Sequence, residues 1–148
     1  MMKTRFLMGK INPKAYQAMV NLNDVVSNSS IDKSLQEIIK IRASQINGCA
    51  YCIDLHTKDA RKKGETEQRI YALSAWKESN FFTEKEKSVL ALTEAITLIN
   101  KEQVPDDIYN EVEKHFNEEE IAQLIMSIIT INAFNRIAIS TRVLPRMD

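Results

Sequence analysis

Cys49, Cys52 and His56 lie close together in the first half of the chain. They are the only two cysteines and one of only two histidines in the sequence. Cysteines at this spacing can close a small disulfide ring, so the pair can store two electrons. A histidine four positions after Cys52 lies on the same face of a helix as that cysteine and can move a proton. These residue types at this spacing predict thiol redox chemistry.

Thiol chemistry at neutral pH needs a device that activates the sulfur. A cysteine reacts as its thiolate, and its free pKa is about 8.5. Asn47-Gly48 ends one expected helix just before another begins. Cys49 and Cys52 therefore fall in a first helical turn, at the positive end of the helix dipole. His56 lies one turn further on, where it can accept the Cys52 proton directly or through a water.

Glu37 is the candidate third member of this site. It lies in the expected helix that precedes the cysteines. If the helices over residues 33–46 and 49–63 pack as a hairpin, its carboxylate reaches His56 or Cys52. A carboxylate beside an imidazole orients the ring and stabilises its protonated form. The plain alternative is an ordinary exposed glutamate on a helix.

Other interpretations of these residues remain open. The cysteines can be inert buried side chains, or they can bind zinc with His56 and Glu37, because thiolate, imidazole and carboxylate are all zinc ligands. Tyr51, between the cysteines, can support the site by donating a hydrogen bond from its phenol. The other histidine, His115, lies near the end of an expected helix, where a cation is favoured, and is interpreted as structural.

The elements that position these residues are expected to be helices. Glycine and proline are scarce, with three of each in 148 residues, which favours long helices over a turn-rich β fold. Apolar spacing and capping residues predict one all-α domain over residues 1–148, a bundle of about six or seven helices. After an irregular lead-in over residues 1–12, the expected helices cover residues 13–26, 33–46, 49–63, 66–76, 83–100, 105–116 and 117–139.

The last expected helix is apolar on more than one face between Ile121 and Ile139. A helix of this kind is buried on all sides. It is therefore either the central helix of a small domain or a helix with one face against another subunit, and the two interpretations are compatible. No uncharged apolar run of about 18 residues exists, so no transmembrane span is expected.

Charge and composition limit the kinds of partner that this chain is expected to bind. Twenty basic and twenty acidic residues give a formal net charge of zero, which argues against a broad nucleic-acid surface. Neither a nucleic acid nor a membrane is an expected partner. No apolar signal-peptide region follows the first basic residues, so a cytoplasmic location is expected. In a reducing cytosol a C-x-x-C pair indicates catalysis or metal binding more often than a structural disulfide.

Four of these residues form a longer motif, E-x11-C-x2-C-x3-H, made of Glu37, Cys49, Cys52 and His56. The surrounding stretch EIIKIRASQINGCAYCIDLHTKDA supports the motif, as do residues 64–69 and 131–136. With these features the chain resembles the carboxymuconolactone decarboxylase-like superfamily, in its alkylhydroperoxidase D-type (AhpD-like) branch. The resemblance extends from about Pro13 to Ile139.

That resemblance implies an all-α homo-oligomer, commonly a trimer or hexamer, that reduces hydroperoxides with its thiols. It implies that Cys52 attacks the peroxide, that Cys49 is the resolving thiol, and that Glu37 and His56 form a proton relay. Family members take electrons from a dithiol donor such as a lipoyl-bearing protein, and some pass them to a peroxiredoxin. The best-studied branch carries a histidine directly before the second cysteine, where this chain has Tyr51.

The sequence therefore predicts a cytoplasmic antioxidant oxidoreductase, an alkylhydroperoxidase that cycles through a Cys49–Cys52 disulfide with no metal or other cofactor. In this mechanism activity falls as the pH drops below the pKa of Cys52. Two alternatives stay open. One is a non-enzymatic redox-sensing oligomer whose disulfide switches a partner interface. The other is an enzyme of the carboxymuconolactone decarboxylase type, which acts on a lactone acid and does not rely on a C-x-x-C pair.

Overall fold

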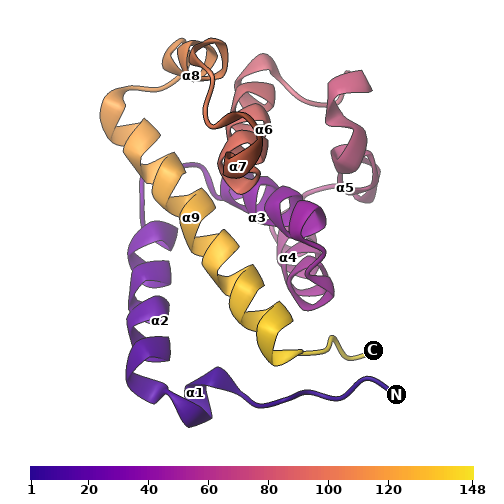
Figure 1. Cartoon of the computed structure of the whole chain (residues 1–148). Helices are drawn as coiled ribbons and strands as arrows, with labels where there is room; N and C mark the ends of the chain where they lie inside the picture. The colour runs from indigo at the N-terminus through magenta and orange to yellow at the C-terminus, as the bar shows by residue number, and fades with distance from the viewer.

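The computed structural model describes all residues, 1–148, and contains helices but no strand. This confirms the predicted all-α class. The helices are α1 Met8–Ile11, α2 Pro13–Ser27, α3 Lys33–Asn47, α4 Ala50–Lys62, α5 Glu67–Ala72, the 3₁₀-helix η1 Leu73–Glu78, α6 Glu84–Thr97, α7 Ile99–Glu102, α8 Asp106–Glu113 and α9 Glu118–Thr141 (Figure 1).

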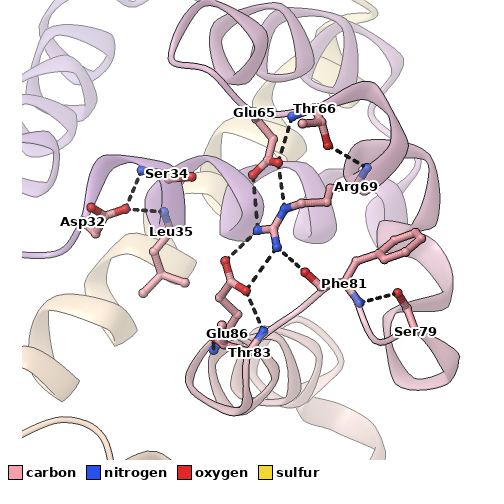
Figure 2. A network of polar contacts seen from close by, with 10 residues as sticks. All are labelled: Asp32, Ser34, Leu35, Glu65, Thr66, Arg69, Ser79, Phe81, Thr83 and Glu86. Carbon is pink, nitrogen blue, oxygen red and sulfur yellow. Dashed lines mark hydrogen bonds and ion pairs between the residues drawn. The ribbon is translucent and has the colours of Figure 1, made fainter.

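Side-chain caps fix where several of these helices begin. The Asp32 carboxylate accepts hydrogen bonds from the first backbone N–H groups of α3 (Figure 2). Thr83 with Glu86 forms a capping box at α6, and Asn117 with Glu120 forms another at α9. Each box pairs two N–H groups that the helix itself leaves without partners. These starts are therefore encoded locally, which is why the sequence predicts them.

Three expected boundaries are wrong in detail. The lead-in contains the short helix α1, the segment 66–76 changes to η1 at Leu73, and the segment 83–100 breaks at Leu98. At η1 the tighter turn brings the ring of Trp76 into the core, where its Nε1 donates to Glu94 Oε1 over 2.7 Å. That tertiary contact has no local signal in the sequence.

α9 runs through the middle of the molecule, with α2 along one side and α3 and α6 on the other (Figure 1). The main core is a cluster of 19 buried apolar residues contributed chiefly by α3, α6 and α9. Among its fully buried members are Ile38, Ile39, Ile41, Val89, Leu90, Leu92, Leu124 and Ile128. α9 is thus the central core helix that its composition predicts.

α9 is also long and apolar enough to cross a membrane, by length and composition alone. The sequence criterion, an uncharged apolar run of about 18 residues, excluded this helix because Arg136 interrupts the run. The expectation that the chain contains no candidate for a membrane span is therefore wrong, because a helix with one charged residue can still be apolar enough. Half of the most apolar stretch of α9 is buried inside the fold. Burial is not complete, since Met126, Ile129 and Ile139 remain exposed.

A charged network joins α5 to α6 at the edge of the core (Figure 2). The Arg69 guanidinium donates to Glu65 Oε1 over 2.8 Å and to Glu86 Oε1 over 2.6 Å, and it also bonds the carbonyl of Phe81. The positive charge of Arg69 pairs with both carboxylates and so offsets the cost of removing them from water. The segment 64–69, which supports the family resemblance, therefore has a structural role here.

The N-terminal segment is tethered to the end of α9. The backbone N–H of Arg5 donates to the carbonyl of Thr141, and its guanidinium donates to the carbonyl of Ser140, each over 2.9 Å. Further along, the Tyr16 ring of α2 meets the Phe134 ring of α9 edge-on, with 6.4 Å between centroids. These contacts place the N-terminal segment and α2 beside the C-terminal half of α9.

Candidate active site

α3 and α4 pack as the expected hairpin, and their junction sets the position of the cysteines. Gly48 ends α3 in the left-handed conformation, with φ 70° and ψ 35°, which glycine adopts without steric cost. Cys49 follows as the N-cap of α4, where its Sγ accepts a hydrogen bond from the N–H of Cys52. A disulfide joins the two residues, whose Cα atoms lie 5.3 Å apart. Both sulfurs thus lie at the positive end of α4.

Amide side chains from α9 hold the same junction in place. Asn47 Nδ2 donates to the Oδ1 atoms of Asn132 and Asn135, each over 2.9 Å. Asn135 in turn donates to Ser44 Oγ over 2.9 Å, and its side chain is completely buried. The second supporting segment of the resemblance, residues 131–136, therefore anchors the turn that leads into Cys49.

Glu37 projects from α3 into the hairpin and is almost completely buried, at 2% exposure. Its Oε1 is hydrogen-bonded by Lys63 Nζ and lies 3.6 Å from Lys40 Nζ. Its Oε2 lies 3.5 Å from His56 Nδ1. That distance is long for a hydrogen bond, yet neither atom has another partner. The structure thus brings Glu37 and His56 together, as the hairpin predicted.

The charge state of Glu37 follows from these neighbours. Burial by itself would raise the pKa of the Glu37 carboxyl, but the contacts with His56 and Lys63 and the charge of Lys40 outweigh it. The result is a pKa of about 2, below the ordinary 4.5. Glu37 is therefore a carboxylate at neutral pH. A carboxylate facing Nδ1 favours a proton on that nitrogen and leaves Nε2 as the nitrogen available to other groups.

A cavity of about 500 Å³ opens beside the disulfide. Cys52 and His56 of α4 form part of its wall, and mainly apolar residues of the N-terminal segment, α2 and α9 form most of the remainder. Its volume falls in the range of sites for small organic ligands. Cys49 is as deeply buried as Cys52 but does not line the cavity. Cys52 therefore borders the cavity, whereas Cys49 does not.

Tyr51 lines the same cavity and is partly exposed, at 38%. Its phenol makes no hydrogen bond within the chain, so the expected donation to the site is not seen here. His115 lies in the turn after α8, outside the cavity lining. No group of three or more histidine, cysteine, aspartate or glutamate side chains in residues 1–148 is arranged to hold a metal ion.

Sequence reasoning missed the two lysines that hold Glu37. Lys40 lies one turn after Glu37 on the same helix, so its spacing was available as a signal. Lys63 belongs to a basic cluster at the end of α4, and nothing in the sequence separates it from Lys58, Arg61 or Lys62. Its distinct role arises only because the hairpin brings that end of α4 over the buried carboxylate.

Comparison with known proteins agrees with the motif. A family model for the carboxymuconolactone decarboxylase family matches residues 13–95, more than half of the chain. The chain belongs to the carboxymuconolactone decarboxylase family. The uncharacterized protein YdfG of Bacillus subtilis is 49% identical to this chain over 131 residues, which cover 88% of this chain and 89% of YdfG. The alkyl hydroperoxide reductase AhpD of Bradyrhizobium diazoefficiens is 40% identical over 47 residues, 32% of this chain and 26% of that protein.

Solved structures extend the family likeness to the whole fold. The crystal structure of ATU0492 from Agrobacterium tumefaciens, a protein of unknown function suspected of antioxidant defence as an AhpD, superposes with a TM-score of 0.97 at 38% identity. The match covers 99% of this chain and 100% of that one. The debrominase Bmp8 shares the fold at a TM-score of 0.79 and 21% identity, over 94% of this chain and 74% of its own. The predicted AhpD-like resemblance and fold are thus confirmed.

Proposed function

We propose that this protein is a thiol-dependent hydroperoxide reductase of the AhpD type in which Cys52 attacks the peroxide. The observation that carries the proposal is that one cavity reaches Cys52 and His56 but not Cys49. Membership of a family that contains AhpD-type reductases supports it at the level of the reaction class. The buried Glu37 carboxylate beside His56 supplies the proton relay that the chemistry requires.

The proposed reaction begins with both cysteines reduced. His56, oriented by Glu37, takes the thiol proton of Cys52, and the helix dipole stabilises the thiolate. The thiolate attacks one oxygen of the hydroperoxide and breaks the O–O bond. Cys52 becomes a sulfenic acid, and the other oxygen leaves as an alcohol after taking the proton from His56. The Cys49 thiol then attacks the Cys52 sulfur, which forms the disulfide and releases water.

A dithiol donor completes the cycle by exchange. One thiolate of the donor attacks the protein disulfide and forms a mixed disulfide. The second thiol of the donor then attacks that mixed disulfide, which releases the donor as a cyclic disulfide and restores both protein thiols. A lipoyl-bearing protein is the proposed donor and a peroxiredoxin is a further electron acceptor. A homo-oligomer in the cytoplasm is the proposed setting. The exposed apolar residues of α9 support assembly, since Met126, Ile129 and Ile139 would otherwise face water.

The test is consumption of cumene hydroperoxide by the reduced protein with dihydrolipoamide as the donor. We expect multiple turnovers in the wild type and none with Cys52→Ser. Reduced Cys49→Ser is assayed without the donor, because a dithiol reduces a sulfenic acid directly; it should consume one equivalent of hydroperoxide and leave a sulfenic acid on Cys52 that dimedone traps. His56→Gln should raise the pKa of the Cys52 thiol, measured by its absorbance as a thiolate. Full activity of Cys52→Ser would exclude the mechanism.

The hydroperoxide assay and two assays with other substrates separate the alternatives. A redox sensor forms the Cys49–Cys52 disulfide but turns over slowly with a good donor. A lactone decarboxylase remains active on its own substrate when both cysteines are replaced. Because a debrominase shares the fold, a brominated pyrrole serves as a comparison substrate, and bromide release without hydroperoxide reduction would move the assignment to dehalogenation.

A further inference from the structure

The cavity follows one face of α9 for most of its length. Ala138 packs against Cys49 and Cys52, so its position on α9 marks the part of the cavity beside the reactive sulfur. Ser127 also lines the cavity, eleven positions earlier on the same helix. At about 1.5 Å of rise per residue, these positions lie about 16 Å apart. The site is therefore long, with the sulfur at one end of the α9 face and Ser127 towards the other.

α2 supplies the facing wall in antiparallel register. α2 and α9 run in opposite directions side by side (Figure 1). The contact between Tyr16 and Phe134 shows that these two positions lie opposite each other. Counting seven positions forward on α2 and back on α9 from that contact brings Asn23 opposite Ser127. Both residues line the cavity. Between these two pairs of residues the wall includes apolar side chains, among them Val20 and Ile131.

Ser127 differs from the other hydroxyl residues of this wall. Thr130 and Thr141 each donate to a carbonyl of the preceding helical turn, over 2.7 and 2.8 Å. Ser127 is 97% buried, and its Oγ has no hydrogen-bond partner in the chain. A buried hydroxyl without a partner is unfavourable. Because Ser127 lines the cavity, rotation about its Cα–Cβ bond would turn the hydroxyl towards a bound molecule, which can supply the missing partner.

We propose that Ser127, with Asn23, forms a polar subsite for the far end of an elongated apolar substrate. The substrate class is an organic hydroperoxide whose reactive group lies at Cys52 and whose other end carries a hydroxyl, carbonyl or amide. A hydroxyl, carbonyl or amide suits Ser127 and Asn23, whose side chains both donate and accept hydrogen bonds. The lysines that line the cavity, Lys10 and Lys40, come from α1 and α3 rather than from α2 and α9. The hydroperoxide end rests on the proposed function, whereas the Ser127 subsite requires only the cavity.

The test uses two alcohols that cannot react, so that binding is measured apart from turnover. Dodecanediol carries hydroxyls at both ends, at a separation close to the length of the cavity, and dodecanol carries one. Each is titrated by calorimetry into the disulfide form. We expect Ser127→Ala to weaken binding of the diol about five- to tenfold, the loss of one hydrogen bond. Dodecanol should be weakened by a smaller factor, because its one hydroxyl can lie at either end of the cavity.

Two further variants establish where the ligands bind. Val20→Phe fills the cavity wall and should weaken both ligands. Val25→Phe is the matched control, since Val25 lies on the same helix but is 71% exposed, and it should weaken neither. Equal diol affinity in wild type and Ser127→Ala, or no binding by the wild type, would overturn the subsite.

Turnover assays with matched hydroperoxides distinguish this failure from failure of the reductase proposal. One hydroperoxide carries a hydroxyl at its far end and the other a methyl group. If both hydroperoxides are reduced and Ser127→Ala has no effect on their turnover, the subsite proposal fails and the reductase proposal stands. Binding of the diol that depends on Ser127, without reduction of either hydroperoxide, keeps the subsite and removes the reductase.

Discussion

At the scale of single residues, the site is organised around one buried carboxylate. Glu37 lies between His56 on one oxygen and two lysines on the other. The sequence predicts the Glu37–His56 pair, because the motif and the hairpin both point to it. It does not predict the lysines, because their roles depend on the angle at which α4 crosses α3. Lys63 thus acts as a positioning residue for the carboxylate.

The depressed pKa of Glu37 predicts a pH-dependent contribution to stability. A carboxyl with a pKa of about 2 in the folded chain and 4.5 when unfolded stabilises the fold fully above about pH 4.5. That contribution is lost as the pH falls towards 2, and in full it amounts to about 3 kcal/mol. Glu37→Gln should therefore unfold more easily in urea near neutral pH, and its deficit should shrink below about pH 4.

Glu113→Gln is the control for this measurement, because Glu113 is exposed on α8. Its stability should follow that of the wild type across the pH range, since surface substitutions usually change stability by less than about 0.5 kcal/mol. Circular dichroism at each pH gives both curves. A Glu37→Gln deficit that stays constant from neutral pH to about pH 3 would contradict the assigned ionisation.

At the scale of elements, the α3–α4 hairpin carries the cysteines and α9 fixes its turn. The caps at Asp32 and Gly48 are local signals, so the sequence predicts both helices closely. The amide network is not predictable in this way, because Asn47 meets Asn132 and Asn135 from the far end of the chain. A buried asparagine on an apolar helix is a hint, but its partner is visible only in three dimensions.

The network makes Asn135→Ala a sensitive substitution. Asn135 is completely buried, and its loss removes partners from Ser44 and Asn47 at once. We expect a loss of about 2–3 kcal/mol in the free energy of unfolding, measured by urea denaturation. Asn21→Ala on exposed α2 surface is the matched control and should change stability by less than about 0.5 kcal/mol. Equal effects of the two substitutions would show that the buried network adds nothing.

At the scale of the whole molecule, α9 is both the centre of the core and part of the surface. Its composition predicts burial on all sides, and a single chain provides this only in part. The kink at Leu98, the 3₁₀ turn around Trp76 and the long cavity are likewise absent from the sequence prediction. Each depends on how helices that are distant in sequence pack together, whereas helix starts and apolar faces are determined by the local sequence.

The exposed side of α9 predicts association of copies of this chain. We expect sedimentation velocity to show a homo-oligomer in the wild type and a shift towards smaller species with Ile129→Glu, which puts a charge where an apolar contact is expected. Ile99→Glu is the matched control, because Ile99 is 53% exposed but belongs to α7 rather than α9. A monomer at all concentrations in the wild type, or equal behaviour of the two variants, would contradict this surface as an interface.

The placement of Trp76 has a practical consequence for spectroscopy. It is the only tryptophan, it belongs to the main core, and it does not line the cavity. Its emission therefore follows loss of the core and should be insensitive to occupancy of the cavity. Tyr16 and Tyr51 do line the cavity. Tryptophan emission thus reports global unfolding, whereas changes in tyrosine absorbance on ligand binding report on the two of the four tyrosines that line the cavity.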